Sequence, residues 1–108
     1  MLRQVAARLQ QALRAQDMAA RYGGEELLLL LPDTTQAAAL ELAERLRQAI
    51  ATMRVRCDPV QLSVTASFGV AQLQPGQSAE QWIERADLAL YRAKRQGRNQ
   101  VCADTAMG

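Results

Sequence analysis

The sequence predicts an α/β (α+β) fold in which helices pack on a small sheet. Gly23 and Gly24 separate a short run, from Met18 to Tyr22, from an unbroken leucine run between about Glu26 and Leu31, as expected of a β-hairpin. On both sides of this hairpin, apolar residues recur at intervals of three and four, which predicts amphipathic helices. The composition agrees, because 49% of the residues are hydrophobic and only 4% are aromatic.

The first expected element is a helix from residue 2 to about residue 15, with arginines and glutamines on its outer face. Its apolar stripe consists of Leu2, Val5, Ala6, Leu9 and Leu13. No Ser, Thr, Asp or Asn precedes this helix as a cap, so its first backbone donors have no local acceptor. Such a start is expected where a sequence begins inside a longer domain.

The leucine run predicts a strand buried on both faces, and Pro32 ends it. Residues 33–35 supply capping oxygens for a second helix that reaches about Met53. This helix is expected to cover one face of the sheet with the stripe Ala39, Leu42, Ala43, Leu46 and Ile50.

A loop containing Cys57, Asp58 and Pro59 is expected next, followed by a strand from about Leu62 to Gln72 that Gly69 interrupts. Pro75 then breaks the chain.

Ser78 is expected to cap the last helix, and Gly97 to end it in a left-handed conformation. Val101 and Cys102 form a final short strand in this reading. The 108 residues are expected to form one domain, 1–108.

Composition excludes several classes of function. Thirteen basic and eleven acidic residues leave a formal charge of +2, too little for bulk electrostatic binding of nucleic acid polymers or membranes. The chain has no histidine, which excludes histidine metal sites and Ser-His-Asp triads. Cys57 and Cys102 lack metal-ligand spacing and are interpreted as reduced thiols. With no leader sequence and no long apolar run, a cytoplasmic location is expected.

Three blocks of sequence occur in the order and spacing of one family: Arg21–Leu27, Ser63–Val70 and Arg85–Asn99. Together they resemble the GGDEF domain, the bacterial module that condenses two GTP molecules into cyclic diguanylate and pyrophosphate in second-messenger signalling. Leu27 stands where the family usually has Phe. The resemblance implies a nucleotidyl-cyclase-like palm, with a mostly antiparallel sheet and helices packed on it.

Adjacent Glu25 and Glu26 point to opposite faces of an extended backbone, so only one can serve a site on a given side. The resemblance implies that Glu25 and Glu26 are the catalytic carboxylates and that Glu25 holds magnesium (Mg²⁺). Gly23 and Gly24 would let backbone amides approach the triphosphate of GTP. The alternatives are a solvated acidic pair and a type I′ turn, in which both glycines need positive φ.

Lys94 and Arg98 lie four residues apart, on one face of the last helix or at its end. In the family, the residues at these positions contact the nucleotide phosphates, and the resemblance implies the same substrate-binding role here. The alternative is that these cations only interact with the helix macrodipole.

Arg14 and Asp17 precede the double glycine at the offset of the family's inhibitory product site, which binds cyclic diguanylate, and Arg45 matches an arginine that completes that site in some members. The alternative is a helical ion pair of Arg14 and Asp17, worth about 0.2 to 0.5 kcal/mol.

The resemblance also implies a first strand with a metal-binding Asp, followed by an Asn and an Asp that read guanine; none has a counterpart in this sequence. We therefore expect a truncated domain that is inactive alone. Its exposed strand edges predict either a rearranged compact sheet or strand exchange, and a homodimer is expected. Two alternative functions are a cyclic diguanylate-binding regulatory module that uses the Arg-x-x-Asp site, and a scaffold without ligand.

Overall fold

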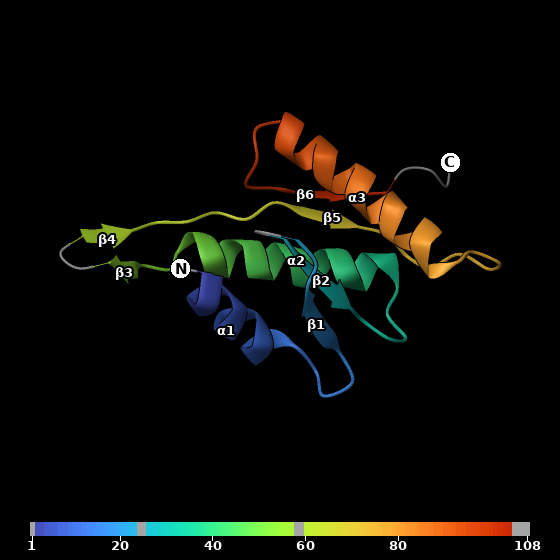
Figure 1. Cartoon of the computed structure of the whole chain (residues 1–108), viewed down its shortest axis with the longest axis horizontal. Helices are drawn as coiled ribbons and strands as arrows, with labels where there is room; N and C mark the ends of the chain where they lie inside the picture. The colour runs from blue at the N-terminus through green and yellow to red at the C-terminus, as the bar shows by residue number, and fades with distance from the viewer. Residues whose placement is uncertain (1, 24–25, 58–59, 105–108) are drawn as a thin grey trace.

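The computed structural model describes residues 2–23, 26–57 and 60–104, and mixes helices with short strands (Figure 1). The elements in chain order are α1 (Leu2–Ala12), β1 (Met18–Arg21), β2 (Leu27–Leu30), α2 (Gln36–Ala51), β3 (Val55–Cys57), β4 (Val60–Leu62), β5 (Phe68–Val70), α3 (Ala79–Arg95) and β6 (Val101–Ala103). This confirms the expected α/β (α+β) class. No described helix is long and apolar enough to cross a membrane.

The described strands form three separate pairs rather than one sheet. β1 pairs with β2 and β3 with β4, both antiparallel, whereas β5 and β6 are parallel. Parallel neighbours need a long crossover connection, usually a helix, and α3 makes this crossover. The expected rearranged compact sheet is therefore absent from the described residues.

The helix caps agree with the sequence. Thr35 caps α2, with its Oγ1 accepting from the backbone N of Ala38 at 3.1 Å. Ser78 and Gln81 form a capping box at the start of α3. Beyond α3, Gly97 has a φ of +120°, the left-handed conformation expected of it.

α1 is shorter than predicted and ends at Ala12. The backbone N of Arg14 donates to Oδ2 of Asp17 at 2.8 Å. This side-chain acceptor offers the backbone an alternative to helical bonding, and the chain turns into a loop.

The predicted strand over residues 62–72 is wrong in extent. β4 ends at Leu62, and β5 covers only Phe68–Val70. Cys57 lies in β3 rather than in a loop, and the backbone of β3 and β4 forms a hairpin that projects from the body of the molecule (Figure 1). Asp58 and Pro59 lie outside the described residues.

Gly69 does not interrupt a strand but stands at the centre of β5. A Cβ atom at this position would overlap the carbonyl oxygen of Ala86 and the backbone N of Leu90. Glycine therefore allows β5 to lie directly against α3, with α2 packing on β5 and β6 from another side.

A buried ion pair fixes α3 to the end of the chain. Nε of Arg85 donates to Oδ2 of Asp104 at 2.7 Å, and Nη2 of Arg85 donates to the same oxygen. Nη1 of Arg85 also donates to the carbonyl of Gln72 at 2.9 Å. Nearby, Arg92 donates to the carbonyl of Ala103, so two arginines of α3 serve the packing of this region.

The apolar core lies between α1 and α2, where Leu9, Leu46 and Ile50 are buried. Leu27 and Leu29 of β2 pack against this core. All four residues of β2 are only half-buried, so the prediction of a strand buried on both faces is wrong. The leucines instead line a hollow of about 1310 Å³ that reaches across to residues 63–73 and α3.

Candidate functional site

The tip of the β1–β2 hairpin is wider than a two-residue turn. The backbone N atoms of Tyr22 and Gly23 both donate to the carbonyl of Glu26, at 2.9 and 3.3 Å. The φ of Gly23 is not in the left-handed region, so the type I′ alternative, which needs positive φ at Gly23, is wrong. Gly24 and Glu25, two of the predicted site residues, lie outside the described residues.

Glu26 follows this turn and faces the last turn of α3. Its Oε1 lies 3.8 Å from Nζ of Lys94. The two side chains retain 41% and 37% of their exposure, so both can still reach a ligand in solvent. The structure thus brings together two predicted site residues that are 68 positions apart in the sequence.

Asp87 interacts electrostatically with both Glu26 and Lys94, and it is not among the predicted site residues. Burial raises the pKa of Asp87, the nearby charge of Glu26 raises it further, and Lys94 opposes the shift. The spacing in the sequence could have identified Asp87, because it precedes Lys94 by two helical turns and therefore lies on the same face of α3.

Arg98 lies beyond the end of α3, in the loop that follows Gly97. Its φ is +61°, and its backbone N donates to the carbonyl of Ala93 at 2.9 Å. It is therefore at the end of the helix rather than on its face. Glu26, Asp87, Lys94 and Arg98 all line the same hollow.

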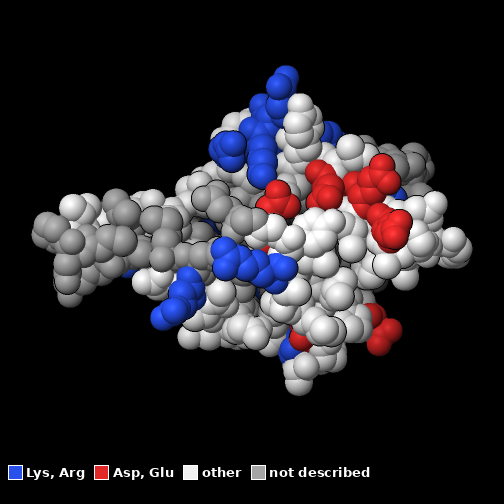
Figure 2. Space-filling view, in the orientation of Figure 1, with Lys and Arg blue, Asp and Glu red and all other residues white. Residues whose placement is uncertain are grey.

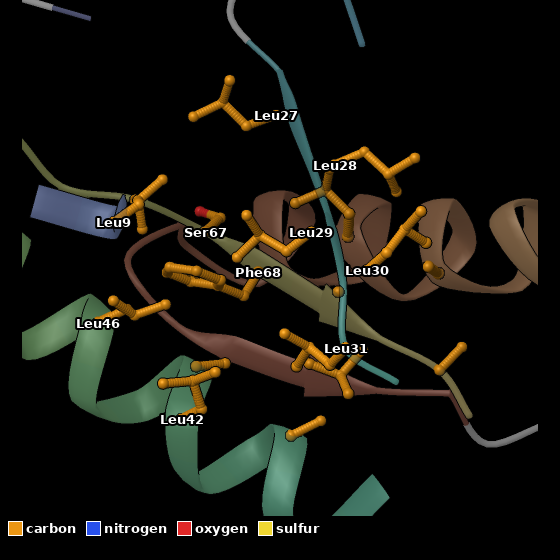
Figure 3. Close-up of a pocket in the computed structure, with 18 of the residues that line it drawn as sticks. Leu9, Leu27, Leu28, Leu29, Leu30, Leu31, Leu42, Leu46, Ser67 and Phe68 are labelled. Carbon is orange, nitrogen blue, oxygen red and sulfur yellow. The ribbon is translucent and has the colours of Figure 1, made fainter. Parts of the chain in front are cut away.

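The hollow itself is mostly apolar. Figure 3 shows the leucines of β2 together with Phe68 and with Leu42 and Leu46 of α2 around it. Charged side chains therefore line part of the hollow, next to its apolar residues. Ligand sites commonly combine an apolar pocket with a few convergent polar groups.

The described residues can bind Mg²⁺ only together with oxygen ligands from a nucleotide phosphate. No cluster of three acidic, Cys or His side chains gathers within the ranges that the structure describes. Mg²⁺ is commonly held by one or two carboxylates together with phosphate oxygens rather than by an all-protein cage. The Glu26 carboxylate is one group of this kind and lies beside the cation Lys94, while Arg98 lines the same hollow, and cations suit phosphate.

Arg14 and Asp17 form a tight pair in the loop between α1 and β1. Nη2 of Arg14 lies 3.0 Å from Oδ1 of Asp17, whose side chain is 1% exposed. Hydrogen bonds from Arg14 lower the pKa of Asp17. Because α1 ends at Ala12, the alternative of a helical ion pair is wrong in its setting.

The same guanidinium ties this loop to the exit of β2. Nη2 of Arg14 donates to the carbonyl of Pro32 at 2.9 Å and to Oγ1 of Thr34 at 2.7 Å. Arg45 is exposed on α2 and lines a groove of about 240 Å³ between α1 and α2. No contact between described residues joins Arg45 to Arg14 or Asp17, so the structure brings together only two of the three residues predicted for the inhibitory site.

Comparison with known proteins assigns the family. Residues 1–100 match the family described as diguanylate cyclase, GGDEF domain. Diguanylate cyclase DgcP of Pseudomonas aeruginosa is 44% identical over 100 residues, which are 93% of this chain and 15% of that protein. Diguanylate cyclase A of Treponema denticola is 41% identical over 101 residues, covering 93% of this chain and 27% of the relative.

Solved structures agree. The GGDEF domain of DgcB from Caulobacter crescentus, crystallised in complex with c-di-GMP, is 32% identical with a TM-score of 0.91, covering 97% of this chain and 63% of that one. Diguanylate cyclase SiaD from Pseudomonas aeruginosa, in complex with its activator SiaC, is 42% identical with a TM-score of 0.87, covering 92% of this chain and 38% of SiaD. The chain therefore spans less than two thirds of each of these relatives, and it belongs to the GGDEF domain family.

Proposed function

We propose that residues 1–108 are part of a single GGDEF domain whose parent protein converts two GTP molecules to cyclic diguanylate and pyrophosphate. The observation that supports this best is the approach of Glu26 to Lys94 at 3.8 Å, beside the hairpin turn. It sets a carboxylate and a cation side by side, as binding of a nucleotide triphosphate with its metal requires.

Each residue of the site has a distinct role in this proposal. The backbone at Gly23 and Gly24 approaches the triphosphate. Glu25 would hold Mg²⁺, with Glu26 beside it as the second catalytic carboxylate, and a bound Mg²⁺ would neutralise phosphate charge and favour attack on the α-phosphorus. Lys94 releases Glu26 and pairs with phosphate instead, an exchange that costs little because exposed ion pairs are weak.

Arg98 follows Lys94 and offers a planar, two-pronged donor for phosphate oxygens. The sharp φ of +61° at Arg98 directs the chain back at the end of α3 and keeps Arg98 beside the same hollow as Lys94. The carboxylate of Asp87 lies two turns before Lys94 on the helix and interacts with its positive charge.

The chain alone is proposed to be inactive. Two GTP molecules must meet, so each of two subunits presents one, and a homodimer is required. In each subunit, the site borders a hollow of about 1310 Å³ rather than a closed pocket that would orient the base and exclude water. GTP binding is therefore expected to be weak and turnover undetectable.

Fluorescence titration with a labelled GTP analogue and Mg²⁺ tests the site. Weak saturable binding is expected for the unmodified chain, and Lys94→Ala should lower the affinity about tenfold, as loss of one charge-assisted contact does. Arg3→Ala is the matched control, since Arg3 is an exposed cation of α1 far from Glu26 in the sequence. Equal losses in the two variants, or turnover of GTP by the isolated chain, would contradict the proposal.

A second function has support from the solved complex of DgcB with c-di-GMP. The Arg14–Asp17 pair offers a guanidinium that is 48% exposed, which can fork onto phosphate or stack on guanine. Calorimetry with cyclic diguanylate separates this regulatory role from the catalytic one. Heat that Arg14→Ala abolishes and Lys94→Ala leaves unchanged supports the regulatory site, and no heat with either protein removes it.

A further inference from the structure

One face of α3 carries two large apolar side chains in solvent. Leu88 is 61% exposed and Tyr91 is 59% exposed. The opposite side of the same helix is buried at Arg85, Ala89 and Ala93, against β5 and β6. The exposed pair therefore forms an apolar patch that the packing of α3 on its own chain does not use.

The patch is flanked by opposite charges at helical spacing. Glu84 precedes Leu88 by four residues, and Arg95 follows Tyr91 by four, so all four side chains lie on one face of α3. Among the described residues neither Glu84 nor Arg95 forms an ion pair. Arg95 instead lies over the ring of Tyr91, with 5.8 Å between its Cζ and the ring centroid.

Along the whole of α3, acidic and basic side chains follow the same order as Glu84 and Arg95. Apart from Arg85, which is buried and paired with Asp104, acidic residues occupy its first half and basic residues its second half: Glu80, Glu84 and Asp87, then Arg92, Lys94 and Arg95. Figure 2 shows acidic and basic side chains gathered in separate areas on the side of the molecule where α3 lies. When two such helices run in opposite directions, the acidic half of each faces the basic half of the other.

The four face residues are arranged symmetrically about one point. The midpoint between Leu88 and Tyr91 falls between Ala89 and Leu90, and the midpoint between Glu84 and Arg95 falls at the same place. A two-fold axis through that point relates each residue to its complement.

We propose that α3 packs antiparallel against α3 of a second copy of this chain. Leu88 then contacts the partner's Tyr91, and Glu84 pairs with the partner's Arg95, each contact occurring twice. Because only a few apolar side chains are buried on each side, the contact is small and the association is transient. It needs no nucleotide, so its success or failure is separate from that of the proposed function.

Sedimentation velocity over a concentration series, without GTP or Mg²⁺, tests the pairing. Glu84→Arg and Arg95→Glu should each raise the dimer dissociation constant at least about tenfold, because each places like charges together twice. Leu88→Gln should do the same by removing the apolar contact. Glu41→Arg on α2 is the matched control, because it makes the same charge change at another exposed position and should alter nothing.

Mixing the two charge-reversal variants gives the sharpest result. Each alone should be monomeric, but a heterodimer of Glu84→Arg with Arg95→Glu restores both opposite-charge pairs, so the mixture should associate like the unmodified chain. Circular dichroism of each variant checks its folding. A mixture that stays monomeric, an unmodified chain that is monomeric throughout, or a dimer that survives both substitutions, as strand exchange would, overturns the proposal.

Discussion

The unit formed by β5, α3 and β6 and the hairpin formed by β1 and β2 differ in how completely they are packed. In the first, α3 buries Ala89 and Ala93, and Arg85 pairs with Asp104 away from solvent. In the second, every residue of β2 is half-buried and every residue of β1 is exposed. Yet the strands of both regions are short and mostly apolar.

The difference follows from connectivity. A strand, a helix and a parallel strand close in sequence cover one another through a single crossover. In the hairpin, β1 hydrogen-bonds to only one of the two edges of β2, and neither strand covers a face of the other. The site joins the two regions, with Glu26 on the hairpin and Lys94 on the packed unit, so a rigid support holds one half of the site and a partly covered element holds the other.

The largest expected effect is the loss of the buried ion pair. Arg85→Ala should lower the free energy of unfolding by about 3–5 kcal/mol, because it removes the guanidinium that pairs with the buried carboxylate of Asp104. Urea denaturation measures this. Replacing both members, as in Arg85→Met with Asp104→Leu, should cost much less. A loss below about 1 kcal/mol for the single variant would show that Asp104 finds water or another donor.

Glycine substitutions compare the two regions directly. Gly69→Ala should destabilise by about 1–3 kcal/mol or more, because the new methyl group overlaps the backbone of α3. Gly23→Ala in the hairpin is the control. Its added Cβ lies 3.9 Å from Cβ of Glu26 and its φ is not left-handed, so thermal unfolding should change little. Equal losses would remove the distinction between the regions.

Truncating a leucine of β2 should cost less than truncating a core leucine. Leu28→Ala is expected to lower the free energy of unfolding by about 1 kcal/mol, since Leu28 is half-buried and borders the hollow. Leu46→Ala is the comparison, because Leu46 is 3% exposed, and core truncations of this kind cost about 2–5 kcal/mol. Similar costs would indicate that the hollow closes in solution.

The smallest effect concerns a surface carboxylate on α2. Hydrogen bonds from Arg47, and a weaker contribution from Gln48, lower the pKa of Glu44 from 4.5 to about 2. A lowered pKa favours the folded state above pH 4.5, and this contribution disappears as the pH falls through about 2. Titration by NMR should therefore show the pKa of Glu44 rising in Arg47→Gln, and rising less in Gln48→Ala. No change in Arg47→Gln would rule out this pairing in solution.

Local signals in the sequence were sufficient for the caps and the hairpin. Thr35, Ser78 and Gly97 act within one turn of their own position, so their roles could be predicted without knowledge of the packing. The β1–β2 pairing was equally local. The approach of Glu26 to Lys94 was expected only through the family resemblance, because nothing near either residue in the sequence specifies the other.

Features that depend on distant packing were missed. The β3–β4 hairpin has strands of only three residues each, too short for a clear alternating pattern. The role of Gly69 depends on contact with α3, and the raised pKa of Asp87 depends on Glu26. The half-burial of β2 could not be predicted from its leucines. Their pattern shows that the strand can be buried on both faces, but not whether other elements are present to cover those faces.

Paramagnetic relaxation tests the site most directly. Mn²⁺ in place of Mg²⁺, added with a nonhydrolysable GTP analogue, broadens the NMR signals of nuclei close to the bound ion. We expect broadening at the amides of Gly23 and Glu26 and at the Lys94 side chain, only when the nucleotide is present, and none at Arg3 of α1. Broadening elsewhere, or no broadening at Glu26 and Lys94 at saturating nucleotide, would contradict the assignment of this hairpin and α3 as a metal–nucleotide site.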